Sequence, residues 1–254
     1  MTVFFIGAGP GAADLITVRG RDLLARCPVC LYPGSLTPPD LLAHCPPDAK
    51  RIDTADLSLD EIVGELVAAD RAGHDVARLC SGDPSIYSAV AEQMRRLDAA
   101  GVRYEVVPGV PAFAAAAAEL GRELTVPTVG QSLVITRVQA RSTAMPPGEE
   151  LATFAASGTT LALHLAINRV EQVAEELLPH YGADCPVAVV HLASQPGQQI
   201  LRGTLGGIAS QVRAAGITRA AIIFVGRVLA AGNFPDSYLY SAARDRSEKR
   251  RDVG

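Results

Sequence analysis

Residues 76–80 and the loop that follows them constrain the fold of this chain more than any other stretch. Val-Ala-Arg-Leu-Cys at 76–80 is typical of a buried strand, and it is followed by Ser81-Gly82-Asp83-Pro84 and by a helix expected to begin near Ser85. In an open α/β sheet, ligands bind outside the carboxyl ends of the strands. Gly82 would let a ligand approach the backbone closely, and the Asp83 carboxylate would accept hydrogen bonds from it. An ordinary strand-to-helix turn with a capping aspartate explains the same residues. The choice between a ligand-binding loop and such a turn therefore depends on the rest of the sequence.

Composition narrows the class of protein. A length of 254 residues allows one large or two modest domains, and 48% hydrophobic with 20% charged residues is typical of a globular chain with a substantial core. The net charge of -4 and the absence of tryptophan argue against a nucleic-acid partner. The apolar runs are too short to span a membrane, and the N-terminus lacks a signal-peptide pattern. We therefore expect a cytoplasmic protein without a membrane partner.

The cysteines do not indicate a disulfide framework or a metal site. Their number is five, which is odd. Cys27-Pro28-Val29-Cys30 has the CxxC spacing, but no second pair lies at metal-ligand spacing. We expect no bound metal.

The glycine-rich loop Gly7-Ala8-Gly9-Pro10-Gly11 follows an apolar strand at 2–6 and invites comparison with a dinucleotide-binding loop. Pro10 lacks a backbone N–H where a phosphate would need one. No acidic residue follows the next strand to bind a ribose. Both observations argue against a dinucleotide site. We keep an NAD(P)-dependent oxidoreductase only as the alternative from a different functional class, and binding of NAD(P) would identify it.

Strand and helix patterns alternate along nearly the whole chain, which predicts two consecutive α/β domains. We expect an N-terminal domain at 1–120, a linker at 121–130 and a C-terminal domain at 131–242. Residues 243–254 are charged, lack an apolar face and are expected to form a disordered tail.

Several loops, taken together in their order and spacing, resemble the tetrapyrrole methylase family over roughly residues 3–228. The stretches that carry the resemblance are 5–11 with 15–17, 79–84, 107–110, 131–137, 186–194 and 203–205. The resemblance implies a class III methyltransferase fold, with S-adenosylmethionine bound in a cleft between the two α/β domains. It also implies S-adenosylhomocysteine as product, a small-molecule tetrapyrrole as substrate, and a homodimer.

Two stretches indicate one branch of that family. Tyr32-Pro33-Gly34-Ser35-Leu36, and residues 84–89 with Glu92-Gln93, resemble the enzymes that methylate corrin precursors in cobalamin biosynthesis. The Phe-Gly-Arg-Gly-type stretch of uroporphyrinogen methylases is absent after Pro84. The chain departs from the family pattern at Ala12-Ala13-Asp14, where Gly-Asp-Pro is common. A methylase acting at another ring carbon or on a cobalt-containing substrate, and a tetrapyrrole carrier without chemistry, remain open.

The resemblance also assigns site residues. The donor-binding residues that it implies are Gly82, Asp83, Ile86, Val110, Pro111, Leu165, Ala193 and Ser194. The substrate-side residues are Gly9, Pro10, Gly11 and Tyr87, with Arg137 and Arg141 as partners for substrate carboxylates. Arg19 and Arg169 are weaker candidates for the same role. His164 lies in an apolar strand and is expected to be a core residue, and no general base is assigned.

Overall fold

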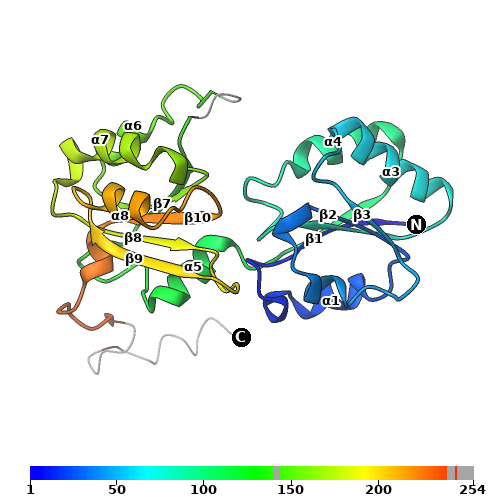
Figure 1. The fold of residues 1–254 in the computed structure, drawn as a ribbon, viewed down its shortest axis with the longest axis horizontal. Coiled ribbons are helices and arrows are strands. Elements are labelled where there is room, and N and C mark those ends of the chain that lie inside the picture. Colours follow the sequence, from blue (N-terminus) through cyan, green and yellow to red (C-terminus); the bar gives the residue numbers. More distant parts are fainter. Residues whose placement is uncertain (140–143, 239–243, 245–254) are drawn as a thin grey trace. The chain divides into compact units, whose positions relative to one another are not determined.

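The computed structural model describes residues 1–139, 144–238 and 244, which form two compact units (Figure 1). Unit 1 comprises Met1–Glu119 and Leu192–Gln199, and unit 2 comprises Leu120–His191 and the described residues from Ile200 onward. Arg141 and, except for Arg244, the predicted tail at 243–254 lie outside the described residues. No described helix is long and apolar enough to cross a membrane.

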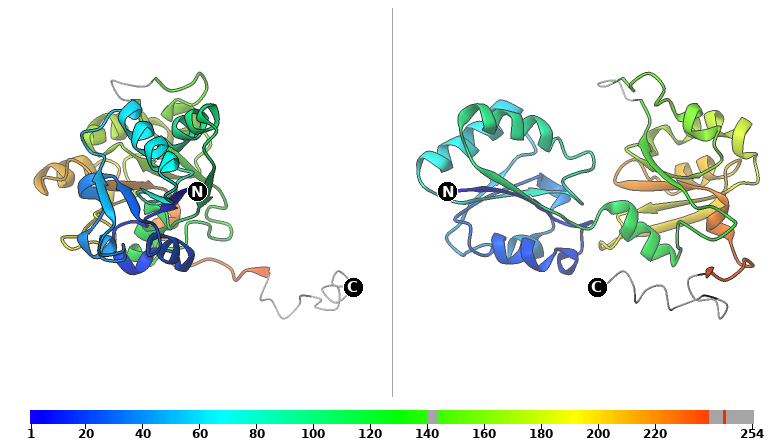
Figure 2. Two further views of the ribbon diagram at one scale, coloured as in Figure 1. Left: turned by 90° about the vertical axis from the view of Figure 1, so that its right-hand side faces the viewer. Right: turned by 180° about the vertical axis from the view of Figure 1, so that it is seen from behind.

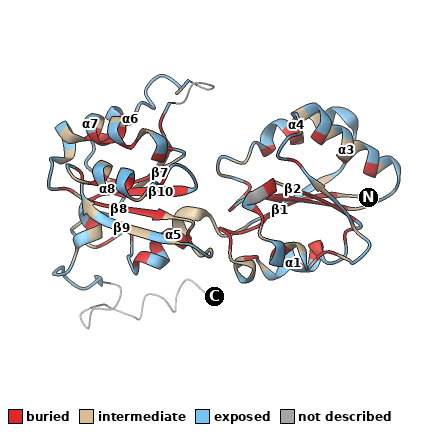
Figure 3. Ribbon diagram, in the orientation of Figure 1, coloured by how far each residue is buried: buried red, intermediate tan, exposed pale blue. Residues whose placement is uncertain are grey.

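Unit 1 is built on a parallel five-stranded sheet with the order β3-β2-β4-β1-β5. Its strands are β1 (Val3–Gly7), β2 (Val29–Tyr32), β3 (Lys50–Asp53), β4 (Val76–Cys80) and β5 (Tyr104–Val107). Every residue of β1 and of β4 is buried, because helices cover both faces of the sheet (Figure 3). The carboxyl ends of β4, β1 and β5 therefore meet along one edge.

The helices of unit 1 divide between the two faces of its sheet (Figures 1 and 2). Those that pack with Phe4 and Ile6 on one face are α1 (Val18–Leu24) and α2 (Pro39–Leu42). Those that pack with Val3 and Phe5 on the other are α3 (Leu59–Arg71) and α4 (Val90–Ala100). The remaining elements are the 3-10 turns Ala13–Leu15 and Gly34–Leu36, and the alanine-rich helix α5 (Ala112–Leu120).

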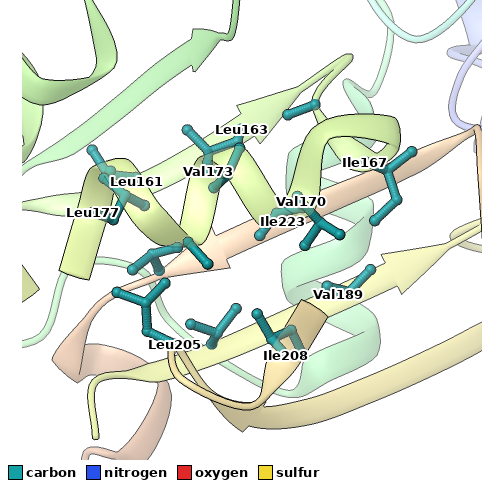
Figure 4. Close-up of a cluster of buried hydrophobic side chains, with 14 of the residues drawn as sticks. Leu161, Leu163, Ile167, Val170, Val173, Leu177, Val189, Leu205, Ile208 and Ile223 are labelled. Atoms are coloured by element: carbon teal, nitrogen blue, oxygen red, sulfur yellow. The ribbon is translucent and has the colours of Figure 1, made fainter. Parts of the chain in front are cut away.

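Unit 2 has a mixed sheet with the order β6-β7-β10-β8-β9. Strands β6 and β7 are parallel, whereas β10 is antiparallel to both β7 and β8. The strands are β6 (Leu133–Arg137), β7 (Thr160–His164), β8 (Pro186–His191), β9 (Gln199–Thr204) and β10 (Ala221–Val225). The helices are α6 (Leu151–Ala155), α7 (Val170–Tyr181) and α8 (Ile208–Ala214), with 3-10 turns at Ile167–Arg169 and Arg227–Ala230. A core that includes Leu161, Val173, Ile208 and Ile223 joins these helices to the sheet (Figure 4).

Two elements differ from the sequence-based expectation. The helix after β4 begins at Val90 rather than near Ser85, because Tyr87 and Ala89 each have φ 52°, which a right-handed helix excludes. Strand β3 was not predicted, since Lys50, Arg51 and Asp53 are exposed on this edge strand and it lacks an apolar run.

Candidate active site

The loops after β1, β4 and β5 pack against one another through glycine. Gly82, with φ 68°, donates its N–H to the Gly9 carbonyl at 2.8 Å, and Gly9 donates back to the Gly82 carbonyl at 3.2 Å. A Cβ atom on Gly7 would lie 2.5 Å from the Gly109 Cα atom, and one on Gly109 would overlap the Gly82 carbonyl oxygen. Backbone therefore meets backbone here, and no side chain fits between the three loops.

Asp83 fixes this arrangement from the loop after β4. Its Oδ2 atom accepts the Gly109 N–H at 2.8 Å, and its Oδ1 atom accepts the Ser85 N–H at 2.8 Å and the Ser85 hydroxyl. Partial burial opposes ionisation, but these hydrogen bonds outweigh it and hold the pKa of Asp83 below its usual value. The carboxylate is therefore ionised at neutral pH and braces the loops after β4 and β5.

The structure brings most of the predicted unit 1 residues to this edge. A Cβ atom on Gly82 would lie 3.6 Å from the Pro111 Cα atom and 3.9 Å from the Val110 carbonyl oxygen. Ile86 is half-buried, and Tyr87 is 46% exposed in the same loop. Arg19, in contrast, lies on the exposed side of α1.

Residues Leu192–Gln199, which connect β8 to β9, bring Ser194 to the Gly9–Gly11 loop. The Ser194 Oγ atom accepts the Ala12 N–H at 3.1 Å, and the Gln195 Nε2 atom donates to the Pro10 carbonyl at 2.8 Å. The Gln195 side chain occupies the position that a Cβ atom on Gly11 would take. Ser194, a predicted donor-side residue, thus contacts the residue that directly follows the predicted substrate loop, and Gln195 contacts the loop itself.

Gln198 holds the same segment from the other side. Its Oε1 atom accepts the Ser194 N–H at 2.7 Å, and its Nε2 atom donates to Glu119 at 2.8 Å. Ala193, the residue before Ser194, is buried. Sequence reasoning missed both glutamines, because Pro10 and Glu119, which accept their side-chain hydrogen bonds, lie far away in the chain.

In unit 2, Arg137 is the last residue of β6, and Leu165 directly follows β7. Arg137 donates to the Val138 carbonyl at 3.4 Å and to the Ala144 carbonyl at 3.3 Å, so its guanidinium supports its own loop. Leu165, directly after β7, has φ 53° and a side chain that is 66% exposed. Arg169 donates to Gln172 at 3.0 Å. Burial lowers the pKa of His164 to about 4, so its imidazole is neutral at pH 7.

Backbone strain gathers at the strand ends of the described chain. Five non-glycine residues with positive φ follow β4, β7 or β8: Tyr87, Ala89, Leu165, Leu192 and Ser194. Such conformations are costly and occur where function or close packing requires them. The dinucleotide-loop alternative gains no support, because a 3-10 turn at Ala13–Leu15 follows the glycine loop and α1 begins only at Val18.

Comparison with known proteins identifies the family. Residues 2–209 match the model of the Tetrapyrrole (Corrin/Porphyrin) Methylases. The chain is 66% identical over 247 residues to a precorrin-4 C(11)-methyltransferase of Rhodococcus erythropolis, covering 97% of this chain and 99% of that one. It is 62% identical to the enzyme of the same name from Mycobacterium tuberculosis, covering 96% and 98%.

Solved structures agree with this assignment. A cobalt precorrin-4 methyltransferase superposes with a TM-score of 0.87 at 39% identity, covering 90% of this chain and 95% of that one. A Thermus thermophilus uroporphyrin-III C-methyl transferase complexed with S-adenyl homocysteine gives 0.77 at 27% identity, covering 91% and 99%. The two sheets with their helices form the class III methyltransferase fold, and the resemblance inferred from the sequence is confirmed. The chain is a methyltransferase and belongs to the tetrapyrrole (corrin/porphyrin) methylase family.

Proposed function

We propose that this methyltransferase transfers a methyl group from S-adenosylmethionine to C11 of precorrin-4, giving precorrin-5 in cobalamin biosynthesis. The observation that carries the proposal is identity of 66% and 62%, over nearly the whole chain, to relatives named for this reaction. The stretches at 32–36 and 84–89, which resemble the corrin branch, support the same assignment.

A cobalt-containing substrate is the second candidate. Relatives named for cobalt-precorrin-4 are 40% identical to this chain, compared with 55–66% for five relatives named for precorrin-4. The metal-free substrate is therefore favoured. Comparing kcat/KM for the two macrocycles tests this choice, and a higher value for the cobalt form would reverse it.

We propose eight residues for the donor site. They are Gly82, Asp83, Ile86, Val110, Pro111, Leu165, Ala193 and Ser194. The fit is supported by the glycine-lined edge beside Asp83 and by the strained backbone at Leu165 and Ser194. A relative that was solved with S-adenyl homocysteine supports the choice of donor.

The substrate side that we propose comprises Gly9, Pro10, Gly11 and Tyr87, with Arg137 and Arg141 as partners of the macrocycle's carboxylates. An arginine can bind a carboxylate through two parallel hydrogen bonds. In an acidic chain, such partners must be supplied locally, because the net charge of -4 does not attract a polyanion.

The chemistry is a direct displacement. The bond between the sulfonium and its methyl group breaks as the bond from methyl to ring carbon forms, and S-adenosylhomocysteine leaves with the electron pair. The methylated macrocycle then releases one proton to solvent, which restores its charge. The bound donor supplies an already activated methyl group, so the chain's residues are needed mainly for alignment and for exclusion of water. Such alignment supplies about 7–11 kcal/mol in well-oriented reactions. We assign no general base, and the imidazole of His164, which is half-buried at the end of β7, is neutral at pH 7.

The experiment is a turnover assay with purified protein, S-adenosylmethionine and freshly generated precorrin-4. The expected product is heavier than the substrate by one CH2 unit, because the transferred methyl group replaces a proton, and S-adenosylhomocysteine forms in equal amount. Absence of methyl transfer to either macrocycle would contradict the proposal. Sedimentation or light scattering tests the accompanying proposal of a homodimer, and fractionation of cells tests that of a cytoplasmic location.

A further inference from the structure

A positive charge is buried in the sheet of unit 1. Arg78 lies in the middle of β4 and is 6% exposed. Within the described chain, its hydrogen bonds go to uncharged acceptors: the Gln93 Oε1 atom at 3.1 Å, the Thr54 Oγ1 atom at 3.3 Å and the Leu79 carbonyl at 3.2 Å. Burying a charge is costly unless hydrogen bonds compensate for it, so this network holds each of its members firmly.

The network continues from Arg78 to two loops at the carboxyl edge. On one side, the Thr54 Oγ1 atom donates to the Tyr32 carbonyl at 3.1 Å, where β2 ends. On the other side, the Gln93 Nε2 atom donates at 2.9 Å to the carbonyl of Ala89, the residue before α4. Strands β2 and β4 are direct neighbours in the sheet. A single buried guanidinium thus connects the end of β2, through Thr54 just after β3, with the loop after β4.

Both connected loops present a large apolar side chain to solvent. Leu36, after β2, is 48% exposed, and Tyr87, after β4, is 46% exposed. These two loops also contain the stretches 32–36 and 84–89 that resemble the corrin branch. Exposed apolar and aromatic side chains on neighbouring loops suit contact with a flat macrocycle.

We propose that Arg78 and Gln93 are positioning residues for the macrocyclic substrate, since their hydrogen bonds set the spacing of the loops that carry Leu36 and Tyr87. This inference rests on the proposed function. The donor side of the same loop has a separate anchor, because Asp83 is held by Gly109 and Ser85. Loss of the Gln93 bond to Ala89 therefore weakens substrate binding and leaves donor binding intact.

Gln93→Glu separates this role from a general role in folding. The glutamate keeps an oxygen acceptor for Arg78, now with a compensating charge, but it has no amide to donate to the Ala89 carbonyl. We expect a KM for precorrin-4 raised roughly tenfold, with the Kd for S-adenosylhomocysteine, measured by calorimetry, within about twofold of the parent value. A Tm close to that of the parent protein verifies folding.

Two further variants complete the test. Thr54→Val removes the hydroxyl that connects Arg78 to Tyr32 at nearly constant volume, and we expect a smaller rise in KM with donor affinity unchanged. Arg95→Gln changes the net charge by the same amount as Gln93→Glu on the exposed side of α4, and it is expected to leave both constants unchanged.

An unchanged KM in folded Gln93→Glu and Thr54→Val, or a parallel loss of substrate and donor affinity, would overturn the inference while the parent enzyme still turns over. Failure of the parent enzyme to methylate the macrocycle would instead overturn the proposed function, and the inference with it.

Discussion

The loops at the strand ends are held by different contacts in unit 1 and in unit 2. In unit 1, contacts link separate loops. Glycine backbones of three loops meet, and Asp83 joins the loops after β4 and β5. Arg78 connects the end of β2 with the loop after β4 through Thr54 and Gln93. In unit 2, the Arg137 side chain supports its own loop, at Val138 and Ala144. A substitution at the unit 1 edge should therefore disturb several loops at once, whereas a substitution of Arg137 should disturb mainly its own loop.

Gly109→Ala is expected to have the largest effect on this comparison. Its methyl group would overlap the Gly82 carbonyl oxygen and press on Gly7, and both obstacles are backbone. We expect a loss of about 3 kcal/mol in the free energy of unfolding, measured by urea denaturation, together with loss of S-adenosylhomocysteine binding.

Gly64→Ala is the matched control for that substitution. Gly64 lies inside α3, and a Cβ atom there meets nothing within 4 Å. Replacing a glycine in a helix interior by alanine should raise stability by about 0.5–1 kcal/mol. An equal loss in the free energy of unfolding for Gly109→Ala and Gly64→Ala would show that the backbone contacts of Gly109 do not cause the destabilisation.

Asp83→Ala should have the next largest effect. It removes the acceptors of the Gly109 and Ser85 N–H groups, which costs about 1–3 kcal/mol when such groups are left unsatisfied. We expect affinity for S-adenosylhomocysteine, measured by calorimetry, to fall at least roughly tenfold.

Arg137→Ala should instead raise the KM for the macrocycle and leave donor affinity intact, and a joint loss of both affinities would contradict the role assigned to Arg137.

His164 makes the stability of unit 2 depend on pH. Burial lowers its pKa from 6.5 to about 4, so the folded chain resists a proton that the unfolded chain accepts. The stabilisation from the neutral imidazole is complete above pH 6.5 and is lost as the pH falls from 6.5 to 4. Relative to the parent protein, His164→Leu should therefore gain in Tm on acidification from pH 7 to pH 4.5. A constant difference in Tm would show that His164 does not titrate in this way.

Gln195→Leu should have the smallest effect. The leucine keeps apolar bulk over Gly11 but loses the hydrogen bond to the Pro10 carbonyl, at a cost of about 1 kcal/mol. We expect a modest rise in the KM for the macrocycle, with Gln199→Leu, at an exposed neighbouring position, as control. Identical kinetics for the two variants would show that the Gln195 contact with Pro10 does not affect substrate binding.

Local patterns predicted most of the fold. The capping box of Ser58 and Glu61 is present, with the Ser58 N–H donating to Glu61 at 2.7 Å and the Glu61 N–H donating to the Ser58 hydroxyl at 3.3 Å. Buried apolar runs predicted β1 and β4. The late start of α4 was missed, because it depends on how the loop at 83–89 is held rather than on helix propensity.

The candidate site was predicted less completely, since part of it depends on contacts between distant residues. Gly82 and Asp83 were found because a strand end followed by Gly-Asp-Pro is a local signal. The bonds of Gln195 to Pro10 and of Arg78 to Gln93 require knowledge of which loops meet. The charged Arg78 inside an apolar strand was the one visible hint of the second contact.

The most direct test of the central claim is the position of the new methyl group. Turnover of precorrin-4 with S-adenosylmethionine that carries a ¹³C-labelled methyl group places the label in the product, where NMR identifies the ring carbon that bears it. We expect a single labelled methyl group, on C11. A label on any other ring carbon would leave the fold and the family in place and would contradict the proposed reaction.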